Sequence, residues 1–315
     1  MPSGWLGLDI GGTKVAAGVV DEKGDVWGFT ELPTRAEEPF STSFAQVVTA
    51  ARTVMGKAEE AGWQVRAVGA GCPGPLDPVE GVIHAPPNLP AWDGQPVRAK
   101  LEDALGLKVA CDNDGNLAAL AEARQGAGRG YSHLVLFTLG TGVGGGVIVE
   151  GEMLHGARGA AGELGHLVVD AGGLPCSCGG RGCLEAYASG TGLLRRTEAA
   201  LSREPNGSRL VPPLSVPGIV DAVREGDRLA GQVWEETIRY LAAGVVSAVH
   251  AFNPQVVVIG GGIGAAGDIL FPPLRRLVAE WGMRYLTEGV PVVPAALGRK
   301  AGVIGAGILA RERWR

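Results

Sequence analysis

One short pattern occurs twice in this chain, and it constrains the fold more than any other feature. Each copy has an apolar run with a polar residue near its end, a glycine-rich turn and a second apolar run. The first copy reads LGLDIGGTKVAAGVV from Leu6, and the second reads LVLFTLGTGVGGGVIVEG from Leu134. Apolar strands joined by a Gly-rich turn predict β-hairpins. A repeat this short is weak evidence by itself, but hairpins that open two halves of one chain predict a two-lobed nucleotide-binding protein.

The turn of the first hairpin carries groups that suit a bound phosphate. It reads Gly11-Gly12-Thr13-Lys14 between the predicted strands Trp5–Asp9 and Val15–Val20. Backbone N–H groups of such a turn can face phosphate oxygens, and Lys14 would add positive charge. Asp9 would end the first strand, where its carboxylate would hold Mg²⁺ directly or through water. The alternative, in which the glycines serve only the turn, fits this motif equally well.

An acidic segment lies where a predicted strand meets a predicted helix. Asp112-Asn113-Asp114-Gly115-Asn116 follows the strand 108–111 and precedes the helical pattern 117–125. In open α/β sheets, ligands bind outside the carboxyl ends of the strands, and this places Asp114 beside a ligand crevice. An acid at a helix N-terminus is also a common cap, so the position alone leaves both roles open for Asp114.

The segment from Gly162 to Glu185 concentrates donors for a metal ion. Three thiols and an imidazole are a usual donor set for tetrahedral zinc, and here they are His166, Cys176, Cys178 and Cys183. Four protein ligands leave no open position, so this zinc would brace structure and would not activate water, as a zinc hydrolase or oxidoreductase requires. A reactive thiol pair is the alternative, although redox pairs usually have the spacing CxxC and not CxC.

Composition indicates a folded α/β protein. The 315 residues are 46% hydrophobic and 19% charged, and the formal net charge of −5 gives no reason to expect a nucleic-acid partner. The N-terminal residues lack a basic region followed by a long apolar run, and Pro254 interrupts the most apolar later stretch. Neither a secretory signal nor a membrane span is therefore predicted. Five cysteines, three of them clustered, favour a reducing cytoplasm.

Other segments extend the α/β pattern to the end of the chain. The Pro-rich segment 85–92 predicts an ordered loop in which Asn88 faces a ligand or forms a turn. The strand 255–259 runs into Gly260-Gly261-Gly262, which would bring the backbone close to a nucleoside. The last predicted helix would pack on the N-terminal half. Helical spacing predicts helices over 41–62, 186–201, 228–252, 268–281 and 300–313. No role is assigned to His84, His133, His155 and His250, whereas Cys72 and Cys111 are assigned to the core.

Together these motifs resemble the ROK family of sugar kinases and repressors. The most specific motifs are GELGH and CSCGGRGCLE. The resemblance extends from Leu6 to about Gly307 through LDIGGTK, GCPGPLD, APPNLPAW, DNDGN, TLGTGVGGG and VVVIGGGIG. It implies the two-lobed, actin-like (ribonuclease H-like) α/β ATPase fold with a cleft between the lobes. Residues 1–112 and about 300–315 would form a small lobe, and residues 113–299 a large lobe.

The resemblance also implies a role for each motif. Asp114 matches the family's catalytic base, which would accept the proton of the attacking sugar hydroxyl. His166 would touch both the zinc and the sugar. The residues that match sugar contacts are Asn113, Glu163, His166 and Glu185. The matches to the two phosphate loops are Asp9, Gly11, Gly12 and Thr13, and Thr138, Gly140, Thr141 and Gly142, while Gly260–Gly262 match the adenosine region.

The resemblance predicts an ATP-dependent hexose kinase that phosphorylates the 6-hydroxyl of glucose. Mannose, fructose, allose and N-acetylmannosamine are alternative acceptors, because the ring-contacting motifs are shared. The implied cofactors are ATP with Mg²⁺ and a structural Zn²⁺, and a homodimer or homotetramer is expected, with no nucleic-acid or membrane partner. A non-catalytic sugar-sensing protein is a further alternative. Family repressors carry an N-terminal helix-turn-helix domain and tend to lack an intact first phosphate loop, whereas LDIGGTK is complete and begins at Leu6.

Overall fold

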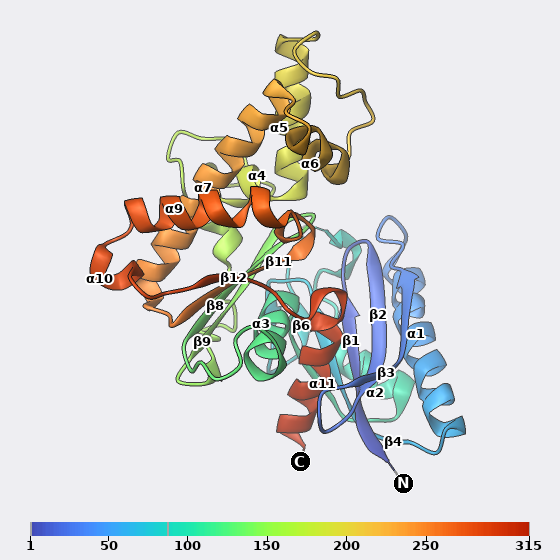
Figure 1. Ribbon diagram of the computed structural model, residues 1–315. Coiled ribbons are helices and arrows are strands. Elements are labelled where there is room, and N and C mark those ends of the chain that lie inside the picture. The colour runs from blue at the N-terminus through green and yellow to red at the C-terminus, as the bar shows by residue number, and fades with distance from the viewer. Residues whose placement is uncertain (1, 87, 315) are drawn as a thin grey trace. The chain divides into compact units, whose positions relative to one another are not determined.

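The computed structural model describes residues 2–86 and 88–314, and it separates into two compact units (Figure 1). The first unit comprises Met1–Gly130, Gly146–Gly162 and Leu297–Arg315, and the second comprises Tyr131–Gly145 and Glu163–Ala296. This division differs from the lobe boundaries predicted at residues 112 and 300. Helix α3 (Asp114–Gln125) belongs to the first unit because it packs against helix α11 (Ala301–Arg313) from the other end of the chain.

The first unit is built on a mixed five-stranded sheet. The strand order is β3–β2–β1–β4–β7. Strand β2 is antiparallel to its neighbours β1 and β3, whereas β4 is parallel to β1 and β7. The first predicted hairpin is thereby confirmed. The strands are β1 (Ser3–Ile10), β2 (Lys14–Val20), β3 (Val26–Pro33), β4 (Gln64–Cys72) and β7 (Val109–Asn113).

Helices α1 (Phe40–Glu60) and α11 contact side chains that alternate along β1, so they cover opposite faces of this sheet (Figure 1). Leu6 and Leu8 of β1 lie in a core that includes Val47 of α1. Gly7 faces α11, because a Cβ at this position would lie 2.0 Å from the carbonyl oxygen of Val303. The absent side chain lets α11 approach the sheet closely. The prediction that the last helix packs on the N-terminal half is confirmed.

Shorter elements complete the first unit. Helix α2 (Val97–Leu105) precedes β7, and β5 (Leu76–Asp77) pairs with β6 (Val82–Ile83). The predicted loop 85–92 ends in the 3-10 turn η1 (Pro90–Trp92), where the buried Trp92 donates its indole N–H to Ser43 Oγ. Strand β9 (Val143–Val149) runs from the second unit into the first and there pairs with β10 (Glu152–Met153).

The second unit combines parallel strands with several helices. Strand β8 (Leu134–Leu139) runs parallel to β11 (Val256–Gly260), which runs parallel to β12 (Val292–Pro294). The 3-10 turns are η2 (Leu164–His166) and η3 (Gly267–Ile269). The helices are α4 (Glu185–Ala188), α5 (Gly190–Arg203), α6 (Val216–Arg224), α7 (Arg228–Phe252), α8 (Gly261–Gly264), α9 (Phe271–Trp281) and α10 (Arg284–Thr287). The helix predicted over 228–252 is therefore confirmed.

Two predicted helices of the second unit are corrected, and one observed helix was not predicted. The helix predicted over 186–201 is interrupted at Ser189, whose backbone is extended and whose Oγ accepts the Gly192 N–H as the cap of α5. The helix predicted over 268–281 begins at Phe271, with proline in its first turn, where a missing N–H costs nothing. Helix α6 has no counterpart among the predicted helices, because its first residues, Val-Pro-Gly, are typical of a turn.

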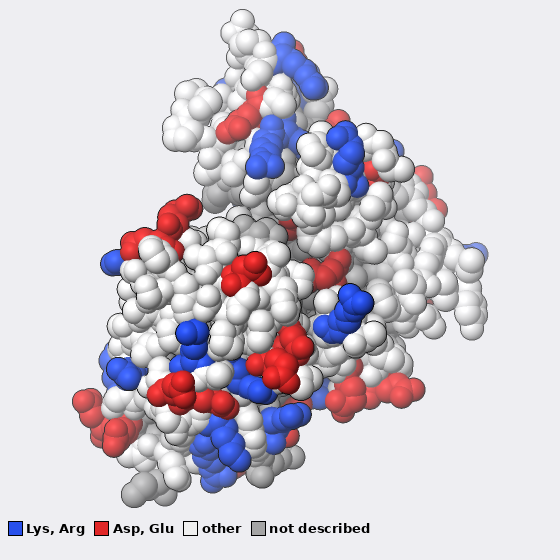
Figure 2. Space-filling model, turned by 180° about the vertical axis from the view of Figure 1, so that it is seen from behind, with Lys and Arg blue, Asp and Glu red and all other residues white. Residues whose placement is uncertain are grey.

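Charged side chains of both signs are interspersed on the face that Figure 2 presents. Opposite charges that alternate in this way partly cancel one another's field. No helix within residues 2–86 and 88–314 combines the length and the apolar character that crossing a bilayer demands.

Candidate active site

Asp114 begins a helix directly where a strand ends. Strand β7 ends at Asn113, and α3 begins at Asp114. Asn113 is the cap of this helix, because its Oδ1 accepts the N–H groups of Gly115 at 2.8 Å and Asn116 at 3.3 Å. The capping role considered for Asp114 is thus filled by its neighbour. One carboxylate oxygen of Asp114 accepts the Gly115 N–H at 2.8 Å, which orients the carboxylate at the start of the helix.

A buried acid and a histidine form a pair beside this junction. Asp112 is 3% exposed, and its Oδ2 lies 2.7 Å from His155 Nε2. The hydrogen bond with Asp112 raises the pKa of His155, and partial burial opposes this shift. The sequence assigned no role to His155, because its partner is 43 residues away and no local motif links the two. In the sequence, only Asp112, the acid before Asn113-Asp114, could have indicated that a partner such as His155 lies here.

The turn of the first hairpin is held by backbone bonds and a buried threonine. The N–H of Gly11 donates to the carbonyl of Lys14 at 2.9 Å. Thr34 is fully buried and donates its hydroxyl to the Gly11 carbonyl at 2.6 Å. Asn88 lies beside the turn, since a Cβ at Gly12 would come within 2.9 Å of Asn88 Cβ. The structure therefore brings together the Pro-rich loop and the first hairpin, and position 12 has no room for a side chain.

Lys14 is paired with an acid of the neighbouring strand. Its Nζ forms an ion pair with Glu31 of β3, and Arg299 contacts the same carboxylate. The hydrogen bond from Lys14 lowers the pKa of Glu31. The pairing offsets part of the positive charge that the sequence assigned to phosphate binding.

Asp9 lies at the start of α11. A Cβ at Gly302, in the first turn of this helix, would come within 2.4 Å of the Asp9 carboxylate. Burial raises the pKa of Asp9 to about 6, and the charge of Lys14 opposes the shift. The free N–H groups and the dipole at a helix N-terminus favour an anion at this place. The arrangement holds a carboxylate suited to Mg²⁺ at the end of the strand that enters the first turn.

The turn of the second hairpin is anchored to the start of α5. The N–H of Gly190 donates to the Gly140 carbonyl at 2.8 Å, and the Thr191 hydroxyl donates to the Thr141 carbonyl at 2.9 Å. A Cβ at Gly142 would lie 2.4 Å from Glu185 Oε2. The turn is therefore fixed through its carbonyl groups, and it has no space for a larger residue at position 142.

Glu185 connects this hairpin to the cysteine segment. Its Oε2 accepts the Val143 N–H at 2.9 Å, and its Oε1 accepts the Ser177 hydroxyl at 3.0 Å. Burial raises the pKa of Glu163, His166 lowers it, and Glu185 raises it further. Glu163 precedes the turn η2, which His166 ends, and Cys176 Sγ lies 3.8 Å from His166 Nδ1 and 3.9 Å from Glu185 Oε1. These contacts place Glu163, His166 and Glu185, three of the predicted sugar contacts, in one neighbourhood.

The four predicted metal ligands form one compact cluster. Each of His166, Cys176, Cys178 and Cys183 offers one ligand atom, and these atoms all lie within 4.8 Å of one another. Cys178 Sγ and Cys183 Sγ are 3.7 Å apart, close to the separation of about 3.8 Å that Zn–S bonds of about 2.3 Å require at a tetrahedral angle. Burial and the neighbouring thiols raise the pKa of Cys183 to about 12, so a cation would be needed to hold it as a thiolate.

The glycine triplet lies at the end of β11 beside β8. Gly260 pairs with Thr138, and Gly261 has a φ of +83°, a value that favours glycine. A Cβ at Gly261 would lie 2.4 Å from the Leu139 carbonyl oxygen, whereas none of the described residues comes within 4 Å of a Cβ at Gly262. The triplet thus combines close packing with open space at its last glycine.

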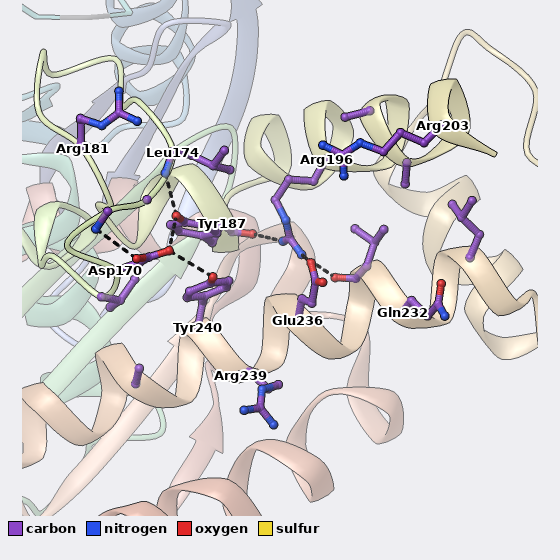
Figure 3. Close-up of a pocket in the computed structure, with 18 of the residues that line it drawn as sticks. Asp170, Leu174, Arg181, Tyr187, Arg196, Arg203, Gln232, Glu236, Arg239 and Tyr240 are labelled. Carbon is purple, nitrogen blue, oxygen red and sulfur yellow. Dashed lines mark hydrogen bonds and ion pairs between the residues drawn. The ribbon is translucent and has the colours of Figure 1, made fainter. Parts of the chain in front are cut away.

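A cavity of about 970 Å³ lies elsewhere in the second unit, beside α5 and α7 (Figure 3). In its wall the rings of Tyr187 and Tyr240 stack with centroids 3.8 Å apart, and both hydroxyls donate to Asp170 Oδ2. Arg196 pairs with Glu236 at 2.7 Å. These polar groups hold α4, α5 and α7 together, and none of the predicted site residues lines the cavity. It is therefore not assigned to the sugar or the nucleotide.

The predicted site residues fall into two groups, one in each unit. The group in the first unit has two parts. One is the turn of the first hairpin with Asn88, and the other is the strand–helix junction with Asn113 and Asp114. The second unit holds Glu163, the ligand cluster, Glu185, the second turn and the glycine triplet.

Comparison with known proteins places these clusters in a family. The model of the ROK family matches residues 5–313. A glucokinase of Thermotoga maritima is 38% identical over 98% of this chain and 97% of its own length. The crystal structure of a ROK hexokinase from Thermus thermophilus is 37% identical, with a TM-score of 0.80 over 98% of both chains. The structure of a ROK family glucokinase from Streptomyces griseus, in complex with glucose and AMPPNP, is 35% identical, with a TM-score of 0.84 over 98% of this chain and 99% of that one.

The matches extend over nearly the whole chain and include both units. They confirm the two-lobed, actin-like α/β fold that the motifs predicted. The chain belongs to the ROK family.

Proposed function

We propose that this protein is a hexose kinase that transfers the γ-phosphoryl group of ATP to the 6-hydroxyl of glucose. It is a sugar kinase, as its full-length similarity to glucokinases indicates, and a ROK glucokinase similar to it binds glucose and AMPPNP. The observation that carries the mechanism is the place of Asp114, at the first position of α3 with its carboxylate oriented by the Gly115 N–H.

Asp114 would act as the general base. The sugar O6 attacks the γ-phosphorus, the bond from that phosphorus to the bridging oxygen breaks, and ADP leaves with the bonding electrons. The proton of the hydroxyl passes to the Asp114 carboxylate. Asn113 uses its Oδ1 to cap α3, and its amide N–H groups would donate to the sugar.

The second unit would orient the sugar ring. Glu185 Oε1 accepts bonds from Ser177 and from the Cys176 thiol, whereas Oε2 accepts one from Val143 and has a second lone pair for a sugar hydroxyl. His166 Nδ1 lies 3.8 Å from Cys176 Sγ, so this nitrogen would face the metal and Nε2 would face the sugar. Glu163 would complete the group of contacts, which fixes one hydroxyl for attack.

A structural zinc would hold these contacts in place. Its proposed ligands are the cluster of His166, Cys176, Cys178 and Cys183, whose spacing suits a tetrahedral ion. When bound, Zn²⁺ would neutralise the thiolates and fix the loop that carries Ser177, a partner of Glu185.

The glycine-rich turns are proposed to bind the nucleotide. Asp9, Gly11, Gly12 and Thr13 of the first hairpin would face Mg²⁺ and phosphate, with Lys14 contributing less because it is paired with Glu31. Thr138, Gly140, Thr141 and Gly142 would form the second phosphate loop. Gly260–Gly262 would lie near adenosine, which the open space at Gly262 supports.

We further propose a homodimer or homotetramer that acts in the cytoplasm. All five cysteines are unpaired, as a reducing compartment requires. Light scattering after size-exclusion chromatography would measure the oligomeric state.

A substrate panel tests the function. Turnover of ATP is measured with glucose, mannose, fructose, allose and N-acetylmannosamine, and the glucose product is checked for phosphate on O6. We expect the highest kcat/KM with glucose. A higher value with another sugar would replace the acceptor but keep the kinase. Sugar binding without turnover on any acceptor would support the sugar-sensing alternative and reject the enzyme.

A further inference from the structure

We infer that His155 is a positioning residue for the catalytic Asp114, acting through the buried carboxylate of Asp112. The inference rests on the proposed function, because it concerns the same phosphoryl transfer. His155 lies in the loop that follows β10, and Asp112 lies in β7, so the pair links two separate segments of the first unit.

Both oxygens of Asp112 are occupied by neighbours. Its Oδ1 accepts the N–H of Asn113 at 2.7 Å and the side-chain N–H of Asn116 at 2.9 Å. Its Oδ2 lies 2.7 Å from His155 Nε2. A carboxylate only accepts hydrogen bonds, so this histidine nitrogen carries the proton. Asn116 is 1% exposed, and no described residue pairs with its Oδ1, so the bond to Asp112 decides how its amide is oriented.

These bonds lie on both sides of Asp114 along the chain. Asp112 holds the backbone of Asn113 before it and the side chain of Asn116 after it. Asn113 in turn caps the helix that Asp114 begins. A movement of the Asp112 carboxylate would therefore shift the cap, the first turn of α3 and the catalytic carboxylate together.

His155 supplies the positive partner for this buried acid. A buried carboxylate is costly unless it is paired and hydrogen-bonded. The side chain of His155 is 39% exposed and borders a cavity of about 930 Å³ in the same unit. Bonding to Asp112 raises the pKa of His155, so His155 keeps its positive charge to a higher pH than a free histidine would. The other charged or titratable side chains that line the cavity are Asp77, Glu80, His84, Arg98, Glu102, Cys111, Arg158 and Arg313.

The loop that carries His155 is itself fixed. The Leu154 N–H donates to Val147 of β9 at 2.9 Å, and the carbonyl of His155 accepts the Ala161 N–H at 3.0 Å. Gly159 packs against Pro78, since a Cβ there would lie 2.2 Å from Pro78 Cδ. His155 thus acts from a braced loop, which a positioning residue requires.

Steady-state kinetics of His155→Ala, His155→Gln and His84→Ala test the inference on the full-length protein. In His155→Ala we expect kcat on glucose to fall by up to about 100-fold, the loss typical of a misplaced catalytic group, while the KM for ATP changes by less than about 3-fold. His155→Gln retains a donor for Asp112 and should restore most of kcat at neutral pH. His84→Ala is the matched control, because it removes a histidine from the same cavity without touching Asp112.

The pH profile separates positioning from a general loss of structure. Wild-type kcat should decline only modestly at alkaline pH as His155 loses its positive charge, because neutral His155 can still donate from Nε2 to Asp112. This decline should be absent in His155→Gln, whose amide does not titrate. Circular dichroism at the assay temperature confirms that each variant is folded. If the wild type is active, two outcomes would overturn the inference while leaving the proposed function intact. One is a kcat of His155→Ala equal to that of His84→Ala, and the other is an alkaline decline of kcat that persists in His155→Gln. A wild type without turnover on any hexose would instead overturn the proposed function.

Discussion

The carboxylate of Asp9 lies against the backbone of Gly302, so closely that a Cβ at position 302 would come within 2.4 Å of Asp9 Cγ. Asp9 lies one residue before the end of β1, and Gly302 lies in the first turn of α11. The absence of a side chain at Gly302 is therefore what allows the proposed Mg²⁺ ligand to occupy the helix N-terminus.

Gly302→Ala should displace Asp9 and lower kcat/KM for MgATP by on the order of 10-fold to 100-fold, as expected for a misplaced group at a phosphoryl-transfer site. The KM for glucose should change little. Gly56→Ala is the matched control, since Gly56 also lies in a helix but no described residue is within 4 Å of a Cβ there. That variant should keep full activity and gain up to about 1 kcal/mol of stability. Equal kinetics for the two variants would argue against a role for Asp9.

Asp114→Asn should reduce kcat by about 100-fold to 10,000-fold, because the amide cannot accept the hydroxyl proton. Glucose affinity, measured by isothermal titration calorimetry, should remain within a few-fold of the wild type, since the amide has nearly the same shape. Asp103→Asn removes an exposed carboxylate from α2 of the same unit and should have no effect. Substantial turnover in Asp114→Asn would exclude Asp114 as the base.

Cys183→Ala should abolish stoichiometric zinc and raise the KM for glucose. Loss of the ion would release the loop of Ser177, which bonds Glu185 at 3.0 Å. Metal content by inductively coupled plasma mass spectrometry and thermal unfolding would report both effects. Cys111→Ala, a buried thiol outside the cluster, should lose some stability by leaving a cavity but retain one zinc per chain. Full zinc content in Cys183→Ala would reject the assigned ligand.

The Asp112–His155 pair should make stability depend on pH with a defined sign. Folding raises the pKa of His155 above its ordinary value of 6.5, so the folded state binds the proton more tightly than the unfolded state does. The resulting stabilisation is fully present below pH 6.5 and is lost as the pH rises through the pKa of the folded state. The difference in Tm between wild type and His155→Gln should therefore be larger at pH 5.5 than at pH 9. A difference that is constant with pH would show that His155 does not titrate with folding.

Local patterns predicted much of the fold because the physics that shapes these segments is local. Alternating apolar residues and glycine turns produce the hairpins around Gly12 and Gly142, and 3.6-residue periodicity produces α1 and α7. The same local reading failed at Ser189, where a side-chain cap ends one helix and begins another within a continuous helical pattern. The local pattern also left open that Asp114 caps α3, although the side chain of Asn113 accepts the hydrogen bond of the cap from the Gly115 N–H.

The sequence by itself determined the proposed metal ligands and the family motifs, because His166, Cys176, Cys178 and Cys183 lie within one short segment whose spacing limits what they can bind. Only the tertiary structure decided which partners complete the proposed catalytic groups. Asp9 meets Gly302, Lys14 meets Glu31, and Asp112 meets His155 through packing of segments distant in the chain. Such contacts depend on how strands and helices assemble around a common core, and no local propensity or spacing encodes them.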